Sequence, residues 1–506
     1  MLFLAFVLLS FAGAIHHELW LDEMDTWLVA RDSHSILQLF HNSRYDGHPF
    51  IWYTLLYLLS AFTSSAFSMQ ILHLAIVVST AFLFLKYAPF TLLQKCCILF
   101  GYFFLFEYNI ICRTYSLTWL FLNLFCICYT SQKRNYTGML IALLLLSNTH
   151  FLSLLLSLPL FAAMTHAFFT DSEKSAKQRY PVYLLLFTAG LFLSALWIMP
   201  PIDTLIIHNI SGHAYTGTRL SKAFSFYFKG MYTLPDFSTP YFWNSNYLVT
   251  HLKPLSIGLS LLVFTGPFIF FYRNRVSLFV FYSGTLLITG ASCILELFTG
   301  VHYMGYVFMT FLVCIWMEKQ QDDGGGQRVE NRRNRGMQKI KNLIFNPFLW
   351  SILITQLLSG CWASYTVFQH PFSQGSAVSA SILTTSSAKD LIVVNPYYSG
   401  PVISGYLQRQ VFYPILNQFG SFYFSKKLPL VSPEELAQRT LQCINRGAPD
   451  RTFIVMDFSP DNFQLMHHLV HGLHSRHLRI KEIRLFKPAI SPGEAYWYCC
   501  LEKSGG

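Results

Sequence analysis

Apolar residues in the first 366 positions form long runs that short polar stretches separate. The runs are about 15 to 22 residues long, the length at which a helix crosses about 30 Å of hydrocarbon. They predict membrane-spanning helices over 1–15, 48–66, 68–86, 92–108, 112–130, 138–154, 153–170, 181–200, 253–272, 276–298, 302–317 and 345–366. Because 138–170 is barely long enough for two helices, the expected number is about 11 or 12.

The composition supports a chain whose main solvent is lipid. Of 506 residues, 53% are hydrophobic and only 12% are charged, with a mean hydropathy of +0.39, whereas soluble domains are about one quarter charged. Backbone groups in a bilayer must be satisfied within helices or a closed barrel, and the runs lack the alternation of barrel strands. The first run has no basic segment before it, so we expect a membrane helix there and not a signal peptide.

The net charge of +11 does not indicate nucleic acid, because the basic residues gather in short connections between apolar runs. Lys and Arg enrichment of this kind marks the cytosolic side of a membrane protein. The cytosolic connections are therefore expected at 131–137, 171–180, 273–275 and the strongly basic 318–344. Lys86 and Lys95 favour the same side, which conflicts with counting every predicted span as a crossing from a cytosolic N-terminus.

Two parts of different character follow from this pattern. Residues 1–366 form the predicted transmembrane part, with extracytoplasmic loops at 16–47 and 201–252. Residues 367–506 read as a small α/β domain on the same side, because DLIVVNP, RTFIVMDF and AYWYCCLEK are typical of buried strands. Ser432 and Glu435 fit a helix start between them. This part contains neither GxGxxG nor a P-loop, so we assign it no catalysis.

The first loop carries an unusual group of carboxylates. Asp22, Glu23 and Asp25 stand between Trp20 and Trp27, a few residues beyond the end of the first run. Tryptophan favours the headgroup level of a bilayer, so these carboxylates would lie where a lipid headgroup lies. A solvated polar loop is the simpler reading, and a catalytic acidic group is the other. A divalent cation, with Asp25 as a ligand, stays open because no spacing requires it.

Further polar groups interrupt the apolar runs. Arg113 follows Glu107 in EYNIICRTYSLTW, and an ionisable residue at a membrane span is by default a functional candidate. An Arg113–Glu107 ion pair is the structural alternative. His150 in LSNTHFLSL and His302 in GVHYMGYVF also enter spans, although a lone histidine is more often a hydrogen-bonded structural group.

The order of these motifs resembles a known superfamily. LWLDEMDTWLVARD with RYDGHPFIWY, then EYNIICRTYSLTW, LLLLSNTHFLSLLL and GVHYMGYVF, is similar to the GT-C glycosyltransferases, in the branch of protein O-mannosyltransferases and aminoarabinose transferases. The resemblance covers about 15–170 and the stretch near 302. It implies a multi-span enzyme that takes a sugar from a polyprenyl- or dolichyl-phosphate donor, and an acidic motif in the first extracytoplasmic loop.

The resemblance also implies roles for single residues. Asp22 matches the catalytic base and Glu23 its partner in the motif. Donor phosphate and substrate binding would fall to His48, Arg113, Tyr115, His150 and His302. The chain departs from the family pattern at Phe50, where a second proline is usual, and at Val301, where an arginine often precedes the histidine.

The expected function is therefore transfer of a hexosyl or pentosyl unit to a hydroxyl of a protein, lipid or glycan acceptor, on the extracytoplasmic face of a cell membrane or of the endoplasmic reticulum. We favour one displacement, which would invert the anomeric carbon, over a covalent intermediate, which would need a second close carboxylate, for which Glu23 and Asp25 are candidates. A transporter or flippase for lipid-linked glycans, or a non-enzymatic assembly factor, is the alternative.

Overall fold

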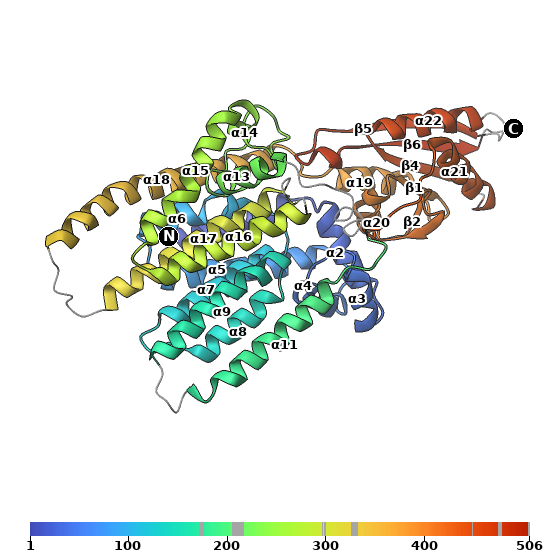
Figure 1. Ribbon diagram of the computed structural model, residues 1–506. Helices are drawn as coiled ribbons and strands as arrows, with labels where there is room; N and C mark the ends of the chain where they lie inside the picture. The colour runs from blue at the N-terminus through green and yellow to red at the C-terminus, as the bar shows by residue number, and fades with distance from the viewer. Residues whose placement is uncertain are drawn as a thin grey trace.

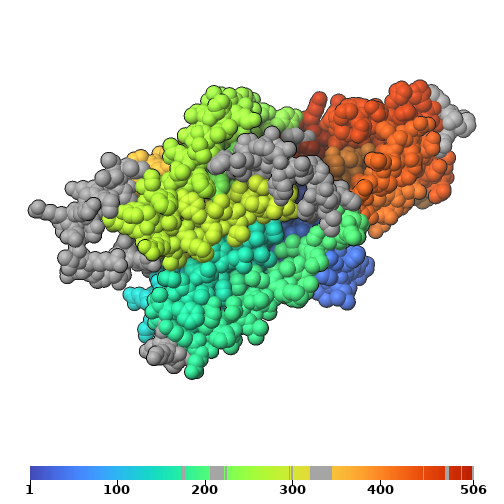
Figure 2. All heavy atoms as spheres, in the orientation of Figure 1, coloured from blue at the N-terminus to red at the C-terminus, as the bar shows by residue number. Residues whose placement is uncertain are grey.

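The computed structural model describes residues 1–171, 177–204, 217–295, 297, 300–324, 332–447, 449–473 and 478–503. Figures 1 and 2 show an elongated molecule in which a helical bundle makes up most of the length and a sheet region lies at one end. Parts of the predicted loops 201–252 and 318–344, including most of the basic residues of 318–344, lie outside the described residues or side chains.

The helices account for most of the first 370 residues. They are α1 (Leu2–His16), α2 (Leu21–Arg31), α3 (Ile36–Ser43), α4 (Phe50–Ser60), α5 (Phe67–Tyr87), α6 (Leu92–Leu99), the π-helical η1 (Tyr102–Glu107), α7 (Tyr115–Thr130), α8 (Tyr136–Ser147), α9 (Phe151–Asp171), α11 (Tyr180–Ile198), α13 (Gly217–Met231), α14 (Tyr247–His251), α15 (Lys253–Phe271), α16 (Arg275–Leu295), α17 (Val301–Gly324) and α18 (Arg332–Gln369).

The fold class predicted from the sequence is confirmed: the chain is a multi-pass helical membrane protein with a small sheet region after the bundle. Seven of the described helices are long and apolar enough to cross a membrane, or eight if α1 and α2, which meet at 81°, form one bent span. Three shorter apolar helices, α4, α7 and α8, accompany them.

The contacts define two ends of the bundle. At one end, which we call the site end, the side-chain amide of Gln70 near the start of α5 donates to the carbonyl oxygens of Ala14 and His17, both at 3.0 Å. At the opposite end, which we call the basic end, Lys95 Nζ at the start of α6 donates to the Leu85 carbonyl oxygen at 2.6 Å. The connection of α7 to α8 and the end of α9 lie at the basic end too, where Arg134 pairs with Asp171.

The predicted span 48–66 is wrong as a crossing. Its helix, α4, has only 11 residues and packs against α2 and α3 at the site end (Figure 1). The amide of Ile51 donates to the Asn148 carbonyl oxygen at 3.3 Å, and the ring of Trp52 lies 6.1 Å from that of His73. Since α5 also begins at the site end, α4 lies across the bundle end and returns there.

This arrangement removes the conflict between the charge pattern and the count of spans. With α4 lying across the end, α5 runs from the site end to the basic end, and the connection that holds Lys86 and Lys95 joins the other basic connections. Hydropathy alone cannot distinguish an apolar helix that lies across a bundle end from one that crosses the bilayer.

The predicted span 92–108 is broken into α6 and η1 where α18 crosses it closely. A Cβ atom on Gly360 of α18 would lie 2.3 Å from the carbonyl oxygen of Phe100 and 2.6 Å from the carbonyl carbon of Gly101. Only glycine permits this approach. The π-helical segment that follows brings Glu107 to the site end, where it is buried, and π-helical turns often occur at functional sites.

The C-terminal part forms a six-stranded sheet in the order β3-β2-β1-β4-β6-β5. Its elements are α19 (Gly375–Thr385), β1 (Leu391–Asn395), η2 (Tyr397–Ser399), α20 (Gly400–Leu407), β2 (Val411–Tyr413), β3 (Gln418–Gly420), α21 (Pro433–Gly447), β4 (Arg451–Asp457), α22 (Pro460–Leu473), β5 (Leu478–Phe486), η4 (Pro492–Glu494) and β6 (Tyr496–Lys503). β1 pairs in parallel with β2 and β4, and the remaining pairs are antiparallel.

Two apolar layers cover the sheet. Side chains of α21 and α22, such as Leu441 and Leu469, pack on one face, and those of α19 and α20, such as Ile382 and Ile403, pack on the other. The three strands expected from the sequence are β1, β4 and β6. The expected helix start is also present, because Ser432 Oγ accepts from the Glu435 amide at 3.2 Å.

The position of α4 can be tested by cysteine labelling in sealed, oriented vesicles. Ser64, which follows α4, Leu430 in the C-terminal part and Lys133 at the basic end are all exposed. Above the background of the parent chain, we expect Ser64→Cys and Leu430→Cys to react with a membrane-impermeant maleimide from the same side, and Lys133→Cys from the other. Labelling of Ser64→Cys together with Lys133→Cys would show that α4 crosses the membrane.

Candidate functional site at the end of the bundle

The acidic motif lies on α2, which turns sharply away from α1. The carboxylate of Glu23 accepts the Trp20 amide at 3.1 Å and so caps the first turn of α2. An acidic side chain at a helix start also favours the helix dipole. α2 packs against α4 and against α20 of the C-terminal part, which places it between the bundle and the sheet region (Figure 1).

Glu23 is a buried anchor. Its side chain has no solvent exposure, and it accepts hydrogen bonds from His17 Nε2 at 2.8 Å and from the Cys112 amide. These donors come from the end of α1 and from the turn before α7. A buried carboxylate needs several donors to offset the loss of water, and here they come from separate segments. Glu23 therefore fixes where α2 starts.

Asp22, one residue earlier, faces the opposite way and forms an ion pair with Arg113. The Asp22 side chain keeps 39% of its exposure, whereas that of Arg113 keeps 8%. The second arm of the guanidinium, Nη2, lies 3.1 Å from His48 Nε2. Since a guanidinium can only donate, His48 accepts through Nε2 and carries its proton on Nδ1. Burial and the nearby Arg113 charge lower the pKa of His48 to about 3, so the ring is neutral.

These residues border a cavity of about 350 Å³ at the site end of the bundle. It is lined by Leu21, Asp22, Asp25, Thr26, Tyr45, Asp46, His48, Arg113, Tyr303, Tyr398, Tyr423 and Ser425. The walls come from α2, from the chain before α4, from the turn before α7, from α17 and from the C-terminal part. The cavity thus joins the bundle to the sheet region and brings one fixed cation to three carboxylates.

The three carboxylates differ in their surroundings. Asp25 is buried and accepts the Tyr423 amide through Oδ1 at 2.7 Å. Burial, followed by the charges of Asp46 and Asp22, raises the pKa of Asp25 well above its usual value. Burial is also the main reason why the pKa of Asp46, which accepts from the Tyr53 hydroxyl, rises to about 6.

Tyr115, His150 and His302 form a layer of rings behind the cavity. The Tyr115 ring lies 5.2 Å from the His150 ring and 5.3 Å from the His302 ring, and the His48 ring lies 4.9 Å from His150. None of the three lines the cavity. Tyr303, the neighbour of His302, reaches the cavity instead.

Arg113 does not pair with Glu107, which was the structural alternative. Glu107 accepts from Trp243 Nε1 at 3.2 Å, and its Oε1 lies 3.5 Å from His302 Nδ1. Arg113 is held by Asp22 and His48, so its charge is directed to the cavity.

The structure brings together Asp22, Asp25, His48 and Arg113 of the predicted residues and separates Glu23 from them. Sequence reasoning did not single out Asp46, although it precedes His48 by two residues in RYDGHP. It also had no signal for Tyr423 and Ser425, which reach the cavity from the far end of the chain. Among the described residues, no group of three or more His, Cys, Asp or Glu side chains is arranged to hold a metal ion.

Glu494 ties the C-terminal part to α2. Its buried carboxyl accepts from the Leu21 amide at 3.2 Å, from Ser373 Oγ at 2.7 Å and from the Tyr496 hydroxyl at 2.8 Å. Burial raises the pKa of Glu494 to about 7. The start of α2 is therefore held from both sides, by Glu23 in the bundle and by Glu494 in the sheet region.

Fold and site together define a multi-pass membrane protein with a charged cavity at one end of its helical bundle. No protein-family model matches the sequence, and no curated relative matches it.

Among solved structures, the chain is similar to ArnT from Cupriavidus metallidurans bound to undecaprenyl phosphate, with 10% identity and a TM-score of 0.44 over 99% of this chain and 97% of that one. The apo form of ArnT gives a TM-score of 0.41 at 10% identity over 98% and 97%. The arabinofuranosyltransferase AftD from Mycobacteria gives 0.41 at 10% identity, over 100% of this chain and 40% of that one. At this level of similarity, the activity of this chain must be argued from its own residues.

The anchoring role of Glu23 predicts a large loss of stability on its removal. Glu23→Ala leaves the buried donors of His17, Trp20 and Cys112 without a partner, and we expect a loss of at least about 3 kcal/mol, because each of the three unsatisfied buried groups costs about 1–3 kcal/mol. Thermal unfolding of the detergent-solubilised protein measures this change. Glu434→Ala, at an exposed position of α21, is the matched control and should stay within about 0.5 kcal/mol. Equal losses of stability in Glu23→Ala and Glu434→Ala would contradict the anchoring role of Glu23.

Glu494 predicts a pH dependence of stability. Its folded pKa of about 7 lies above the ordinary value of 4.5, so the folded state holds the proton more tightly than the unfolded state. Stability is then full below about pH 4.5 and falls as the pH rises through about 7. In Glu494→Gln, which cannot ionise, this part of the decline should vanish. The melting temperature between pH 4.5 and 8 measures it, and an unchanged slope in the variant would contradict the assignment.

Proposed function

We propose that this protein is an integral membrane glycosyltransferase that moves a sugar from a polyprenyl- or dolichyl-phosphate donor to an acceptor hydroxyl. The observation that carries the proposal is the cavity at the end of the apolar bundle, where a partly exposed carboxylate, Asp22, and a fixed cation, Arg113, stand side by side. A donor with a lipid tail and a phosphorylated sugar fits this arrangement, because the tail can contact the apolar bundle while the phosphate and the sugar occupy the charged cavity.

Arg113 suits the phosphate of such a donor. As the bond from the anomeric carbon to the phosphate oxygen breaks, the leaving phosphate gains negative charge. A guanidinium presents several donors in a plane and matches phosphate oxygens. Because Asp22 and His48 hold both of its arms, the cation needs little reorganisation. We place His48 as a positioning residue that holds Arg113.

Asp22 is suited to act as the base that deprotonates the acceptor hydroxyl. The acceptor oxygen attacks the anomeric carbon, its proton passes to the Asp22 carboxylate, and the phosphate leaves with the electron pair of the broken bond. The proton transfer requires a carboxylate within hydrogen-bond reach of the acceptor, and the Asp22 side chain is the most open of the acidic motif. One displacement inverts the anomeric carbon.

Glu23 is not suited to be the nucleophile of a mechanism with a covalent intermediate. A nucleophilic carboxylate would have to touch the sugar, and Glu23 has no exposure and does not line the cavity. We assign Glu23 a positioning role. Tyr115, His150 and His302 support the cavity from behind, and Asp25 and Asp46 complete its acidic wall. A divalent cation at Asp25 stays a possibility of the proposal, with water or the substrate supplying its further ligands.

The proposed orientation puts the site on the extracytoplasmic face, because Lys95 and Arg134, in the described part of the basic connections, lie at the opposite end of the bundle. The membrane would be the bacterial inner membrane, or the endoplasmic reticulum in a eukaryote. A transporter for lipid-linked glycans gains no support from the cavity, because transporter sites lie near the bilayer midplane and this one lies at the bundle end.

A transfer assay tests the proposal. Parent and variants, purified in detergent, receive radiolabelled undecaprenyl- and dolichyl-phosphate sugars with a mixed membrane acceptor fraction. Asp22→Asn should lower transfer at least about 100-fold, the usual contribution of a general base. Asp461→Asn, on the exposed surface of α22, is the matched control and should leave transfer unchanged.

Two results would overturn the proposal in different ways. Undiminished transfer by Asp22→Asn would remove the base role from Asp22. Absence of transfer by the parent with every donor would remove the glycosyltransferase function itself.

A further inference from the structure

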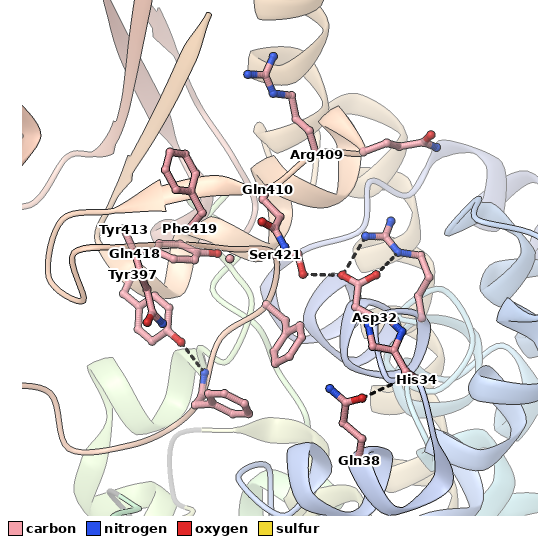
Figure 3. A pocket seen from close by; sticks show the side chains of 15 residues that line it. Asp32, His34, Gln38, Tyr397, Arg409, Gln410, Tyr413, Gln418, Phe419 and Ser421 are labelled. Carbon is pink, nitrogen blue, oxygen red and sulfur yellow. Dashed lines mark hydrogen bonds and ion pairs between the residues drawn. The ribbon is translucent and has the colours of Figure 1, made fainter. Parts of the chain in front are cut away.

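A second polar cavity lies at the C-terminal end of α2, between the first loop and the edge of the sheet region (Figure 3). Its volume is about 500 Å³. A third cavity of about 470 Å³ adjoins it, and the two share Arg409 and Phe419. We call this pair of cavities the Phe419 groove. Neither cavity contains a residue of the proposed catalytic group.

The second cavity is rich in planar polar side chains without net charge. Gln38, Gln408, Gln410 and Gln418 contribute amides. Its guanidinium from Arg31 is engaged by Asp32 at 2.6 and 3.0 Å, and Ser421 Oγ donates to the same carboxylate, as Figure 3 shows. An amide donates and accepts at once, which matches a hydroxyl group, itself both donor and acceptor.

Aromatic rings complement the amides. Phe419 is 52% exposed although it is a large apolar side chain, and it stands where the two cavities meet. Tyr397 and Tyr413 also line the second cavity. An exposed ring in a cavity lined by several amides fits a ligand with an apolar face and a polar rim, which is the chemistry of a pyranose ring.

The third cavity adds positive charge. Lys389, Arg409 and Arg446 line it with a single carboxylate, Asp390. The Asp390 oxygens already accept the amides of Ser387 at 2.7 Å and Arg451 at 3.0 Å. The excess of cations favours an anionic substituent on the ligand at this end of the groove.

Two backbone features concentrate in the same place. Gln408 and Asn417 have positive φ angles of 53° each, and they line the second and third cavity respectively. Such conformations are uncommon for residues other than glycine and occur more often at binding sites. Gln408 is the left-handed residue at which α20 ends.

The groove is separated from the catalytic cavity by one short segment, 421–425. Ser421, Phe422 and Phe424 line the groove, whereas Tyr423 and Ser425 line the catalytic cavity. The segment is fixed by the bond from the Tyr423 amide to Asp25 and by the bond from the Phe424 amide to the Tyr397 hydroxyl at 3.1 Å. The groove and the catalytic cavity therefore have this segment as a common wall.

We infer that the Phe419 groove binds an oligosaccharide of the acceptor, with an anionic unit toward Lys389 and Arg446, so that the acceptor is a glycan. This inference rests on the proposed function, because only a transferase has an acceptor. The binding of a glycan can nevertheless be measured without any transfer. It assigns the C-terminal part the role of holding the acceptor, while the bundle holds the donor.

A binding experiment on the full-length protein in lipid nanodiscs tests the inference. The probes are cellohexaose, maltohexaose, chitohexaose and hexagalacturonate, which cover neutral and acidic chains, and binding is followed by calorimetric titration. Phe419→Ala should weaken binding about tenfold. Phe463→Ala is the matched control, because Phe463 is 53% exposed and lines neither cavity, and it should stay within about twofold. The melting temperatures of both variants should match the parent.

Arg446→Gln distinguishes the contribution of charge to glycan binding from the contribution of shape. This substitution should weaken the binding of hexagalacturonate and leave the binding of the neutral chains unchanged. If no probe binds the parent at millimolar concentration, or if Phe419→Ala and Phe463→Ala have equal effects, the inference is overturned.

The outcomes for transfer and binding are distinguishable. Binding of a probe without transfer to any acceptor supports the groove and removes the proposed function. Transfer to an acceptor that holds no glycan, undiminished in Phe419→Ala, supports the proposed function and removes the groove.

Discussion

The burial of the Glu23 carboxylate is the constraint on which the site depends. A charge at the end of an apolar bundle must be met by fixed donors, and those of His17, Trp20 and Cys112 come from the three segments that meet there. Once Glu23 is held, the helical rotation of about 100° per residue turns Asp22 and Asp25 to the other side, toward the cavity. The proposed base and the buried anchor are therefore adjacent residues on different faces of α2.

The charge of the cavity follows from the same burial. Three carboxylates face a single guanidinium, and they could not all be ionised beside an incoming phosphate at low cost. The raised pKa values of Asp25 and Asp46 reduce this repulsion, because both groups favour the neutral form more than exposed carboxyls do. Arg113 then faces a cavity in which Asp22 is its direct ionic partner. Binding of an anion would raise the two shifted pKa values further.

Local signals revealed part of this design. The carboxylates between Trp20 and Trp27 and the arginine in an apolar stretch were visible in the sequence, as were the buried strands β1, β4 and β6. The crossing at 48–66 was wrong because hydropathy does not record whether a helix crosses the bilayer or lies across the bundle end. The contribution of Tyr423 could not be predicted, because it depends on a contact between positions almost 400 residues apart in the chain.

The C-terminal part is packed too closely on α2 to be an independent appendage. A Cβ atom on Gly405 of α20 would lie 2.2 Å from the Met24 sulfur, so the two helices approach as closely as glycine allows. Glu494 adds a buried bond to the first amide of α2. Any shift of the sheet region would move α2 and, with it, the carboxylates on both of its sides. Because α2 borders one cavity through Asp22 and its C-cap, Asp32, borders the other, one rigid helix fixes the distance between the proposed donor site and the proposed acceptor groove.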